Sequence, residues 1–393
     1  MTPFAITTYT ATTAVGVGRR ALLEALRAGR SGLTRCDFEG AALDCYIGPA
    51  PGLDTPLREQ WAEWDCRNNR LAELALQQDD FSDVALAARQ RYGAERIGTF
   101  IGTSTSGVLQ TELAYRERDP ETQTLPDWYV FDTTQSAFSI ADFVRLRLDL
   151  AGPCVSLSAA CASSAKAFAA AARSILAGFC DAAIVGGVDS LCLTTLFGFN
   201  SLQLLSKDVC RPADADRSGL SIGEAAAFAL LERTSRPGML ALRGWGESSD
   251  AHHMSQPRPD GAGAIQAMRA ALAAARLDPH AIDYVNLHGT ATPANDLAED
   301  RAMGALFGAR VPCSSTKGWT GHTLGAAGMV EAAISLLCIE HGLLPRSLNT
   351  RRKDPALNSN ILMETREAPV RNVMSNSFGF GGVNCSLVLG RLS

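Results

Sequence analysis

The sequence has few histidines, no Cys-x-x-Cys pair and no excess of basic residues. Only six histidines occur in 393 residues, and 36 Lys and Arg against 41 Asp and Glu give a formal net charge of −5. Nucleic-acid-binding domains usually carry a basic excess, so this balance argues against that class. The cysteines number eleven and are widely spread, which is typical neither of a disulfide framework nor of a structural zinc site. We expect most of them to be buried, reduced thiols in a cytoplasmic protein.

Long apolar runs and nucleotide-binding loops are missing as well. No stretch of 18 or more uncharged apolar residues occurs, so we expect no membrane span. Arg19 and Arg20 follow the mildly apolar N-terminal run, an order unlike that of a secretory signal. The glycine-rich run 321–328 lacks the residue order of a phosphate-binding loop, and no Gly-x-Gly-x-x-Gly opens a βαβ unit near the N-terminus. Neither nucleotide interpretation stands.

What is present is a globular pattern in which apolar strands alternate with helices. Hydrophobic residues make up 46% of the chain and charged residues 20%, values normal for a protein with a large core. Continuous apolar runs indicate strands buried on both faces, which favours a mixed or parallel sheet covered by helices. The expected strands are 96–102, 182–187, 225–231 and 386–390, and the expected helices are 19–28, 61–78, 164–177, 263–276, 297–307 and 328–339.

Two segments of the sequence are weakly similar to each other, which suggests an internal duplication. A strand at 155–157 leads through small residues to Cys161 and a helix, and a strand at 283–287 leads through His288 to another helix. Two such units would suit a duplicated fold with its site between the halves. The Ser/Arg/Pro/Gly stretch near 233–240 marks the junction. We therefore expect an N-terminal half over residues 1–236 and a C-terminal half over residues 237–393.

Cys161, His288 and His322 stand out because of where they fall. Cys161 lies just before an alanine-rich helix, whose positive N-terminal dipole would lower the pKa of the thiol. The two histidines lie in turns rich in Gly and Thr and not on helical stripes, which favours function over a structural role. A zinc site would need a third ligand at a recognisable spacing, so we expect no metal there. A thiol hydrolase remains an alternative, although it would not need two histidines.

These residues sit in motifs that resemble one family. Ala-Cys-Ala-Ser-Ser at 160–164, His-Gly-Thr-Ala-Thr at 288–292, Lys-Gly-Trp-Thr-Gly-His at 317–322 and Asn-Ser-Phe-Gly-Phe-Gly-Gly at 376–382 occur in order. Together they resemble the elongating β-ketoacyl-acyl-carrier-protein synthases, types I and II, of the thiolase-like superfamily. The likeness extends from about residue 96 to residue 389. It implies a layered α-β-α-β-α fold made of two duplicated halves, each with a mixed five-stranded sheet.

The resemblance implies a decarboxylative Claisen condensation. Cys161 would accept an acyl chain from the phosphopantetheine arm of an acyl-carrier protein. His288 and His322 would promote decarboxylation of malonyl-carrier protein, and the carbanion would attack the acyl thioester to give 3-oxoacyl-carrier protein and CO2. The backbone N–H groups of Cys161 and Phe380 would form the oxyanion hole, and Phe380 would also gate the cysteine.

The resemblance assigns supporting roles to further residues. Lys317 would be a supporting charge with Glu331 as its partner, although a purely structural ion pair remains an alternative. The substrate-binding residues would be Thr290, Thr292, Phe378 and Thr105. Asn286, Glu331 and Ser375 would hold a structural monovalent cation, and no cofactor would be bound covalently.

The resemblance also implies partners. We expect a homodimer, or a heterodimer with a related synthase subunit, and a basic patch for the acidic carrier protein. Candidate arginines for that patch are Arg67, Arg70, Arg116 and Arg118. The alternative function is a non-condensing subunit that shapes the chain length of a heterodimer, and the presence of Cys161 argues against it. The expected pathway is fatty-acid or polyketide-like or polyene-like chain elongation, and differences at the N-terminus and in the loop 102–107 are compatible with a specialised role of the second kind.

Overall fold

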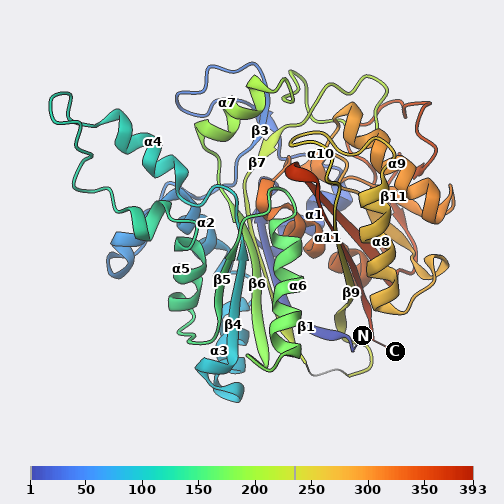
Figure 1. Ribbon diagram of the computed structural model, residues 1–393, viewed down its shortest axis with the longest axis horizontal. Helices are drawn as coiled ribbons and strands as arrows, with labels where there is room; N and C mark the ends of the chain where they lie inside the picture. The colour runs from blue at the N-terminus through green and yellow to red at the C-terminus, as the bar shows by residue number, and fades with distance from the viewer. Residues whose placement is uncertain (1, 234–235, 393) are drawn as a thin grey trace.

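One mixed β-sheet crosses the molecule, with helices packed on both faces (Figure 1). The structure is a computed structural model and describes residues 2–233 and 236–392; the expected junction at 233–240 therefore lies partly outside the described residues. In spatial order the strands are β13 (Asn360–Ile361), β11 (Pro312–Ser314), β10 (Tyr284–Asn286), β15 (Asn372–Gly379), β16 (Val383–Arg391), β9 (Leu240–Ser249), β1 (Phe4–Thr13), β8 (Ala225–Glu232), β6 (Ala182–Asp189), β4 (Ile97–Gly102) and β5 (Cys154–Leu157).

The strand order shows the duplication directly. From the outer edge inward, the first half reads β5-β4-β6-β8-β1, and the second reads β11-β10-β15-β16-β9. Both are third, second, fourth, fifth and first in chain order. In each half the outer two pairings are parallel and the inner two antiparallel. The predicted α/β fold of two related halves with mixed five-stranded sheets is confirmed, with β13 as an additional short edge strand on the second half.

The two halves join through β1 and β9, which pair antiparallel at Phe4↔Leu242 and Ala5↔Ala241. Helices α6 (Ser163–Leu176) and α11 (Ala327–His341) lie between the two half-sheets and contact strands of both. One outer face carries α2 (Arg67–Leu76), α3 (Phe81–Tyr92) and α5 (Ser139–Arg147), and the other carries α8 (Ala262–Ala275) and α9 (Pro293–Phe307). The order of layers is therefore α-β-α-β-α, as expected.

The central helices pack closely because small residues face each other. A Cβ on Gly328 would lie 2.6 Å from the backbone nitrogen of Ala165, so only glycine allows α11 to approach α6 at this point. By length and composition the segment Leu324–His341 could cross a membrane, with mean hydropathy 1.4, but it is 89% buried inside the fold. A helix buried on all sides is apolar on all sides, and the central layer accounts for its composition.

Most predicted helices and strands agree with the structure to within a few residues. The helix expected over 61–78 is instead split into a 3-10 turn, Glu59–Trp64, and α2. Asp65 and Cys66 between them adopt extended backbone angles, which end one helix before the next begins. Two elements near the site were not predicted: α4 spans Val108–Arg116, and α7 spans Leu193–Ser201. The helix predicted over 19–28 is α1 (Gly18–Ala28).

Candidate active site

Cys161 lies in a tight turn between β5 and α6. Ala160 has φ +48°, a left-handed conformation that L-residues adopt rarely. Ser163 braces this turn, because its hydroxyl accepts the Ala159 N–H at 2.8 Å and donates to the Ala160 carbonyl at 2.6 Å. The turn places the Cys161 side chain at the N-terminal end of the buried helix α6, as the sequence predicted.

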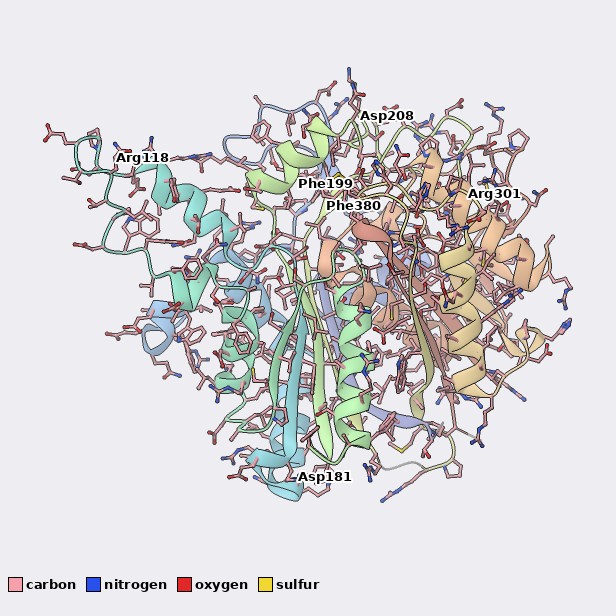
Figure 2. All side chains as sticks on the ribbon, viewed as in Figure 1. Arg118, Asp181, Phe199, Asp208, Arg301 and Phe380 are labelled. Carbon is pink, nitrogen blue, oxygen red and sulfur yellow. The ribbon has the colours of Figure 1, made fainter. Side chains whose placement is uncertain are left out.

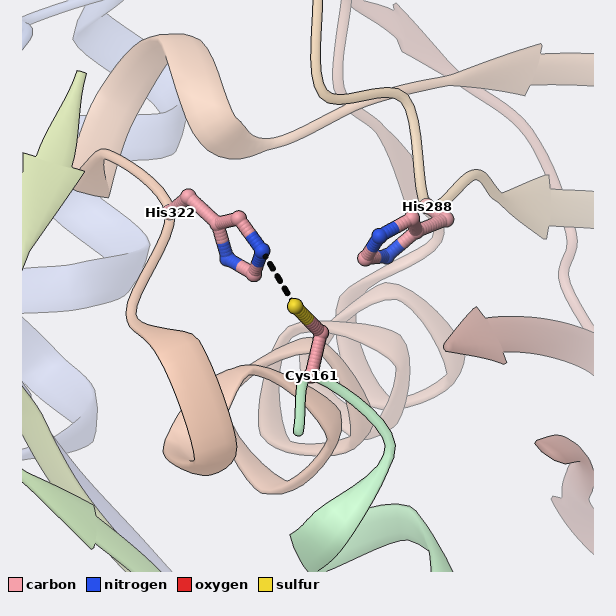
Figure 3. A group of neighbouring side chains, drawn as sticks. All are labelled: Cys161, His288 and His322. Carbon is pink, nitrogen blue, oxygen red and sulfur yellow. Dashed lines mark hydrogen bonds between the residues drawn. The ribbon is translucent and has the colours of Figure 1, made fainter. Parts of the chain in front are cut away.

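The two histidines reach Cys161 from the other half of the molecule. His288 follows strand β10, and His322 follows the short helix α10 (Lys317–Thr320). The Cys161 Sγ atom lies 2.9 Å from Nε2 of His322 (Figure 3). The imidazole rings of His288 and His322 are edge-on, with centroids 5.4 Å apart. Three residues spread over 161 positions of sequence thus form one cluster at the interface of the halves.

The backbone determines which ring nitrogen of His322 carries the proton. The amide of Leu324 donates a hydrogen bond to Nδ1 of His322 at 3.3 Å. Since Nδ1 accepts, the proton of the neutral ring lies on Nε2. Nε2–H therefore points at the Cys161 sulfur as a donor. The His322 amide itself donates to the Ser221 carbonyl at 2.7 Å, which fixes the turn to the segment just before β7 (Ile222–Gly223).

Lys317 gives His288 the same tautomer. The Lys317 ammonium contacts Nδ1 of His288 at 3.4 Å, and it also donates to the His288 carbonyl. An ammonium group can only donate, so Nδ1 accepts and the proton of His288 lies on Nε2. Lys317 in turn pairs with Glu331, and both side chains are 2% exposed. The predicted Lys317–Glu331 pair forms, and it touches His288 as well.

Glu299 is a buried carboxylate that the sequence analysis did not identify. It accepts the backbone N–H groups of His288 and Gly289 at 2.9 and 2.8 Å, and the Asn376 side-chain amide at 3.1 Å. Burial raises the pKa of Glu299 to about 7, although the three hydrogen bonds act to lower it. Glu299 thus holds the turn that carries His288. Its position eleven residues after the histidine, on α9, gave no pattern by which the sequence could reveal it.

Burial sets the protonation states of the cluster. Loss of solvent holds the pKa of His288 and of His322 well below the usual range, and the nearby Lys317 charge acts in the same direction. Both imidazoles are therefore neutral. Burial also raises the pKa of Cys161 to about 11, while Lys317 and the Phe380 backbone N–H act to lower it. Burial therefore opposes the lowering of the thiol pKa that the helix dipole is expected to give.

The three donor atoms also lie close enough together to be tested as a metal site. The Cys161 sulfur and one nitrogen from each histidine lie within 4.8 Å of one another. A tetrahedral zinc ion separates sulfur and nitrogen ligands by roughly 3.5 Å, whereas Sγ and the His322 nitrogen are 2.9 Å apart. The Lys317 ammonium against His288 would also oppose a second cation. The geometry fits a direct hydrogen bond better than a shared metal ion.

A cavity of about 300 Å³ opens beside the three residues. Three of the four predicted substrate-binding residues line it: Thr290, Thr292 and Phe378. The Thr290 and Thr292 hydroxyls are 2.8 Å apart, and the Phe378 ring centroid is 6.0 Å from that of His288. The cavity is thus bounded by polar hydroxyls on one side and aromatic rings on the other.

Phe380 lines the cavity, and its role as a gate stays a prediction. Its ring stacks on Phe199 with centroids 5.5 Å apart and an interplanar angle of 25° (Figure 2). Phe199 belongs to α7, which the sequence analysis missed. Gly381 and Gly382 follow Phe380 with φ of +77° and +69°, a conformation that favours glycine. The segment can therefore change its backbone course where larger residues could not.

The Phe380 amide faces the Cys161 sulfur, since its N–H acts to lower the pKa of that thiol. Gly379 makes this approach possible. A Cβ on Gly379 would lie 3.1 Å from the Ala159 carbonyl oxygen and 3.2 Å from the Cys161 amide nitrogen. The two backbone segments that carry the expected oxyanion-hole donors are thus in direct contact.

Thr105 does not take part in the cavity, contrary to expectation. Its hydroxyl donates to Asp189 at 2.8 Å, and the side chain is buried. Asp189 also accepts the Thr103 hydroxyl at 2.7 Å and the Gly325 N–H at 2.5 Å. The loop 103–105 is therefore tied to the segment that follows His322. Its polar residues satisfy one buried carboxylate, and Thr105 faces that carboxylate and not the cavity.

The residues expected to hold a monovalent cation fit such a role. Among the described residues, Oε2 of Glu331 and Oγ of Ser375 are buried without a hydrogen-bond partner. The Asn286 side chain is fully buried and lies 3.5 Å from the Glu331 carbonyl oxygen. Unpaired buried oxygens are costly, and a cation would satisfy these.

Two of the arginines suggested for carrier-protein docking are already paired. Arg67 makes a two-point contact with the buried Glu224, at 2.8 and 2.6 Å, and Arg70 does the same with Asp65, at 2.7 and 2.6 Å. Arg116 is the last residue of α4, and Arg118 follows it. Figure 2 shows Arg118 well away from Phe199 and Phe380, which line the cavity. Arg67 and Arg70 are therefore held by contacts within the fold, and a docking role for the four arginines stays a prediction.

The fold and the site together define a thiolase-like protein with a Cys-His-His centre. Sequence comparison names the family: the N-terminal domain of β-ketoacyl synthases matches residues 1–236, and the C-terminal domain matches residues 239–351. The chain belongs to the β-ketoacyl synthase family of condensing enzymes.

Individual relatives agree with this assignment. A mitochondrial 3-oxoacyl-acyl-carrier-protein synthase of Arabidopsis thaliana is 40% identical over 266 residues, which cover 62% of this chain and 58% of the relative. A 3-oxoacyl-acyl-carrier-protein synthase 2 of Rhizobium meliloti strain 1021 is 38% identical over 315 residues, covering 75% of this chain and 74% of the relative. The matched region thus spans less than two thirds of the Arabidopsis protein.

Solved structures match over nearly the whole chain. A ketosynthase in complex with its chain length factor from Xenorhabdus doucetiae superposes with a TM-score of 0.90 at 37% identity, covering 99% of this chain and 98% of the other. A β-ketoacyl synthase from Burkholderia phymatum superposes with a TM-score of 0.88 at 32% identity, covering all of both chains.

Proposed function

We propose that this chain is a 3-oxoacyl-acyl-carrier-protein synthase, an acyltransferase that carries its growing chain on Cys161. One observation carries the proposal: two neutral imidazoles, His288 and His322, are both held with Nε2–H free to donate beside one buried thiol. A thiol hydrolase needs one imidazole that can accept the thiol proton. Two fixed donors suit a reaction in which negative charge develops on a thioester oxygen.

The first half-reaction is transfer of an acyl group. The Cys161 sulfur attacks the thioester carbonyl of an acyl-carrier protein, the carrier's thiol leaves, and an acyl-cysteine remains. The backbone N–H groups of Cys161 and Phe380 stabilise the oxyanion of the tetrahedral intermediate. The thiolate that attacks is stabilised by the Phe380 N–H and the Lys317 charge. The pantetheine arm lies along Thr290 and Thr292, which line the cavity.

The second half-reaction uses the two histidines. Malonyl-carrier protein occupies the space freed by the first carrier, and its thioester oxygen accepts Nε2–H of His288 and His322. Loss of CO2 leaves an enolate whose charge these donors stabilise. Its carbon attacks the acyl-Cys161 carbonyl, and the cysteine leaves with the formation of 3-oxoacyl-carrier protein. Lys317 keeps His288 in the donor tautomer, and Glu331 neutralises Lys317.

The proposal also covers the two halves of the chain, the cellular compartment, a structural cation and the partner subunit. We place the two halves at residues 1–236 and 237–393, with the thiol on the first and both histidines on the second. The eleven free cysteines agree with a reducing cytoplasm, and the unpaired Glu331 and Ser375 oxygens agree with a structural monovalent cation.

Chain-length-factor complexes among the similar structures agree with a dimeric partner and a polyketide-like or polyene pathway. The exposed aromatic residues after α4, Trp128 and Phe131, offer surface for such a partner.

Intact-protein mass spectrometry tests the first step. Incubation with acyl-carrier proteins that bear acyl chains of differing length should add the mass of one acyl group to the protein. Peptide mapping should place that group on Cys161. The Cys161→Ser variant should not go beyond this acyl-transfer step. Absence of acylation by every acyl-carrier protein would favour the alternative, a non-condensing partner that shapes chain length in a heterodimer. The presence of Cys161 at the end of α6 speaks against that alternative.

A further inference from the structure

Helix α7 carries one half of an aromatic pair that lines the cavity. Phe199 of α7 and Phe380 stack face to face, and both line the cavity beside Cys161. Figure 2 labels Phe199 and Phe380 next to each other above the ends of the central strands. Any shift of α7 moves Phe199. The contacts that hold α7 in place therefore affect access to the Cys161 thiol.

Carboxylates from two distant elements hold the start of α7. Its own N-cap residue, Cys192, makes no side-chain capping bond. Glu112 supplies the missing acceptor: it accepts the Leu193 N–H at 2.9 Å, the Thr194 N–H at 2.7 Å and the Thr194 hydroxyl at 2.6 Å. The first N–H groups of a helix have no partner within the helix, and a carboxylate there is favoured also by the dipole.

The second carboxylate is Glu224, which accepts the Leu191 N–H at 2.9 Å just before α7. Glu224 is fully buried, pairs with Arg67 and also accepts the Ala50 N–H at 2.9 Å. It therefore ties the segment to the body of the fold. Glu112 differs because it comes from α4, which projects from the body together with the loop that follows it (Figure 1).

The anchoring of α4 extends the connection. Next to Glu112, the Thr111 hydroxyl contacts the Tyr129 hydroxyl at 2.7 Å and the Gln135 side chain at 2.6 Å. The loop after α4 exposes Trp128 and Phe131, at 42% and 55%. Hydrogen bonds thus connect α4 to the segment that follows it, which carries the exposed aromatic residues, and Glu112 connects α4 to α7.

We propose that Glu112 is a positioning residue for acyl transfer: by capping α7 from α4, it holds Phe199 against Phe380 and so restricts access to Cys161. The consequence for catalysis rests on the proposed condensing function. The physical claim, that Glu112 controls how readily a reagent reaches the Cys161 thiol, does not. Loss of this cap loosens the first turn of α7, and the aromatic pair then opens more often.

Alkylation of Cys161 by iodoacetamide tests the claim without any carrier protein. The rate is read by peptide mass spectrometry at one pH, for the wild type and for Glu112→Ala, Glu112→Gln and Glu112→Asp. We expect Glu112→Ala to react about fivefold faster, the factor that loss of one helix cap represents. Glu112→Gln keeps one acceptor oxygen and should be intermediate. Glu112→Asp keeps the charge and should lie closest to the wild type.

Glu117→Ala is the matched control. Glu117 follows α4 and accepts the Trp128 indole N–H at 3.0 Å, and among the described residues its carboxylate makes no hydrogen bond to α7. Its alkylation rate should equal that of the wild type. If Glu117→Ala accelerates alkylation as much as Glu112→Ala, general loosening of α4 explains the effect and the proposal fails.

A purely stabilising cap would give a different result. In that case Glu112→Ala lowers the melting temperature but leaves Cys161 alkylation unchanged, which overturns the proposal. If Glu112→Ala does not fold, Glu112→Gln decides, and a wild-type rate in it also overturns the proposal. Failure of the proposed function is seen separately, as wild-type protein that alkylates at Cys161 but accepts no acyl group from any carrier protein.

Discussion

The amide of Leu324 donates a hydrogen bond to Nδ1 of His322, and this contact leaves Nε2–H of His322 directed at Cys161. The proton position is thus a property of the backbone two residues downstream of the histidine. Because burial keeps the ring neutral, His322 is a fixed donor and not a base. This contact therefore assigns hydrogen-bond donation to His322 and leaves the nucleophilic step to Cys161.

Replacement of His322 by alanine should remove one of the two donors to the malonyl thioester oxygen. We expect decarboxylation of malonyl-carrier protein to fall about 10²–10³-fold, the usual loss for one such donor, while Cys161 is still acylated. CO2 release and intact mass measure the two steps separately. His280→Ala, which changes an exposed histidine far from the cavity, is the control and should leave both unchanged. Equal loss of acylation in His322→Ala would contradict the donor role.

Replacement of Cys161 by alanine should separate decarboxylation from condensation. Without the sulfur no acyl-enzyme forms, so 3-oxoacyl product should be absent. Both histidine donors remain, since their positions depend on Leu324, Lys317 and Glu299 and not on the thiol. We therefore expect continued release of CO2 from malonyl-carrier protein with acetyl-carrier protein as the product. A variant that releases no CO2 would show that the thiol takes part in decarboxylation.

The reactivity of Cys161 should rise with pH over a wide range. Burial raises the pKa of the thiol to about 11, so the protonated form predominates at neutral pH and the thiolate fraction grows as pH rises. Since the thiolate is the nucleophile, the alkylation rate should increase about tenfold per pH unit well below that pKa. Stopped-time alkylation between pH 6 and pH 10 measures this, and the protein should first be shown to stay folded over that range. A plateau that begins near pH 7 would mean a low thiol pKa.

The buried pair of Lys317 and Glu331 should matter for both stability and catalysis. Lys317→Met leaves the Glu331 carboxylate buried without its partner, which typically costs about 3–5 kcal/mol. A second change, Glu331→Met, removes that carboxylate and should restore most of the stability. Decarboxylation should stay low in the double variant, because His288 has lost the donor that fixes its tautomer. Denaturant unfolding and CO2 release measure the two effects.

That double variant also decides between the two interpretations of the pair. If it regains stability and full decarboxylation together, the pair is purely structural. If stability returns alone, Lys317 acts on His288, as their 3.4 Å contact indicates.

Much of the fold could be predicted from the sequence. Apolar runs such as that of β8, where every residue is buried, identify strands covered on both faces. Small-residue helices such as α6 identify the central layer. The split of the helix expected over 61–78 could not be predicted, because Asp65 leaves helical geometry to accept hydrogen bonds from Leu57 and Arg70. Those partners are known only once the chain is folded.

The site residues likewise fall into those that the sequence could predict and those that it could not. Residues inside short motifs, such as Cys161 and His322, could be found because glycine and small residues mark their turns. Phe199, Glu299 and Asp189 could not, since each acts through a partner distant in sequence. The burial that raises the pKa of the Cys161 thiol could not be predicted for a related reason, because it depends on residues from both halves.

Single-turnover reaction of pre-acylated enzyme tests the central claim most directly. Protein carrying one acyl group on Cys161 is separated from free carrier and mixed with malonyl-carrier protein, and CO2, 3-oxoacyl-carrier protein and free acid are measured together. The account predicts one CO2 and one 3-oxoacyl product for each acyl group lost from Cys161, with little free acid. Loss of the acyl group as free acid, without CO2 release, would contradict it and identify a thiol hydrolase instead.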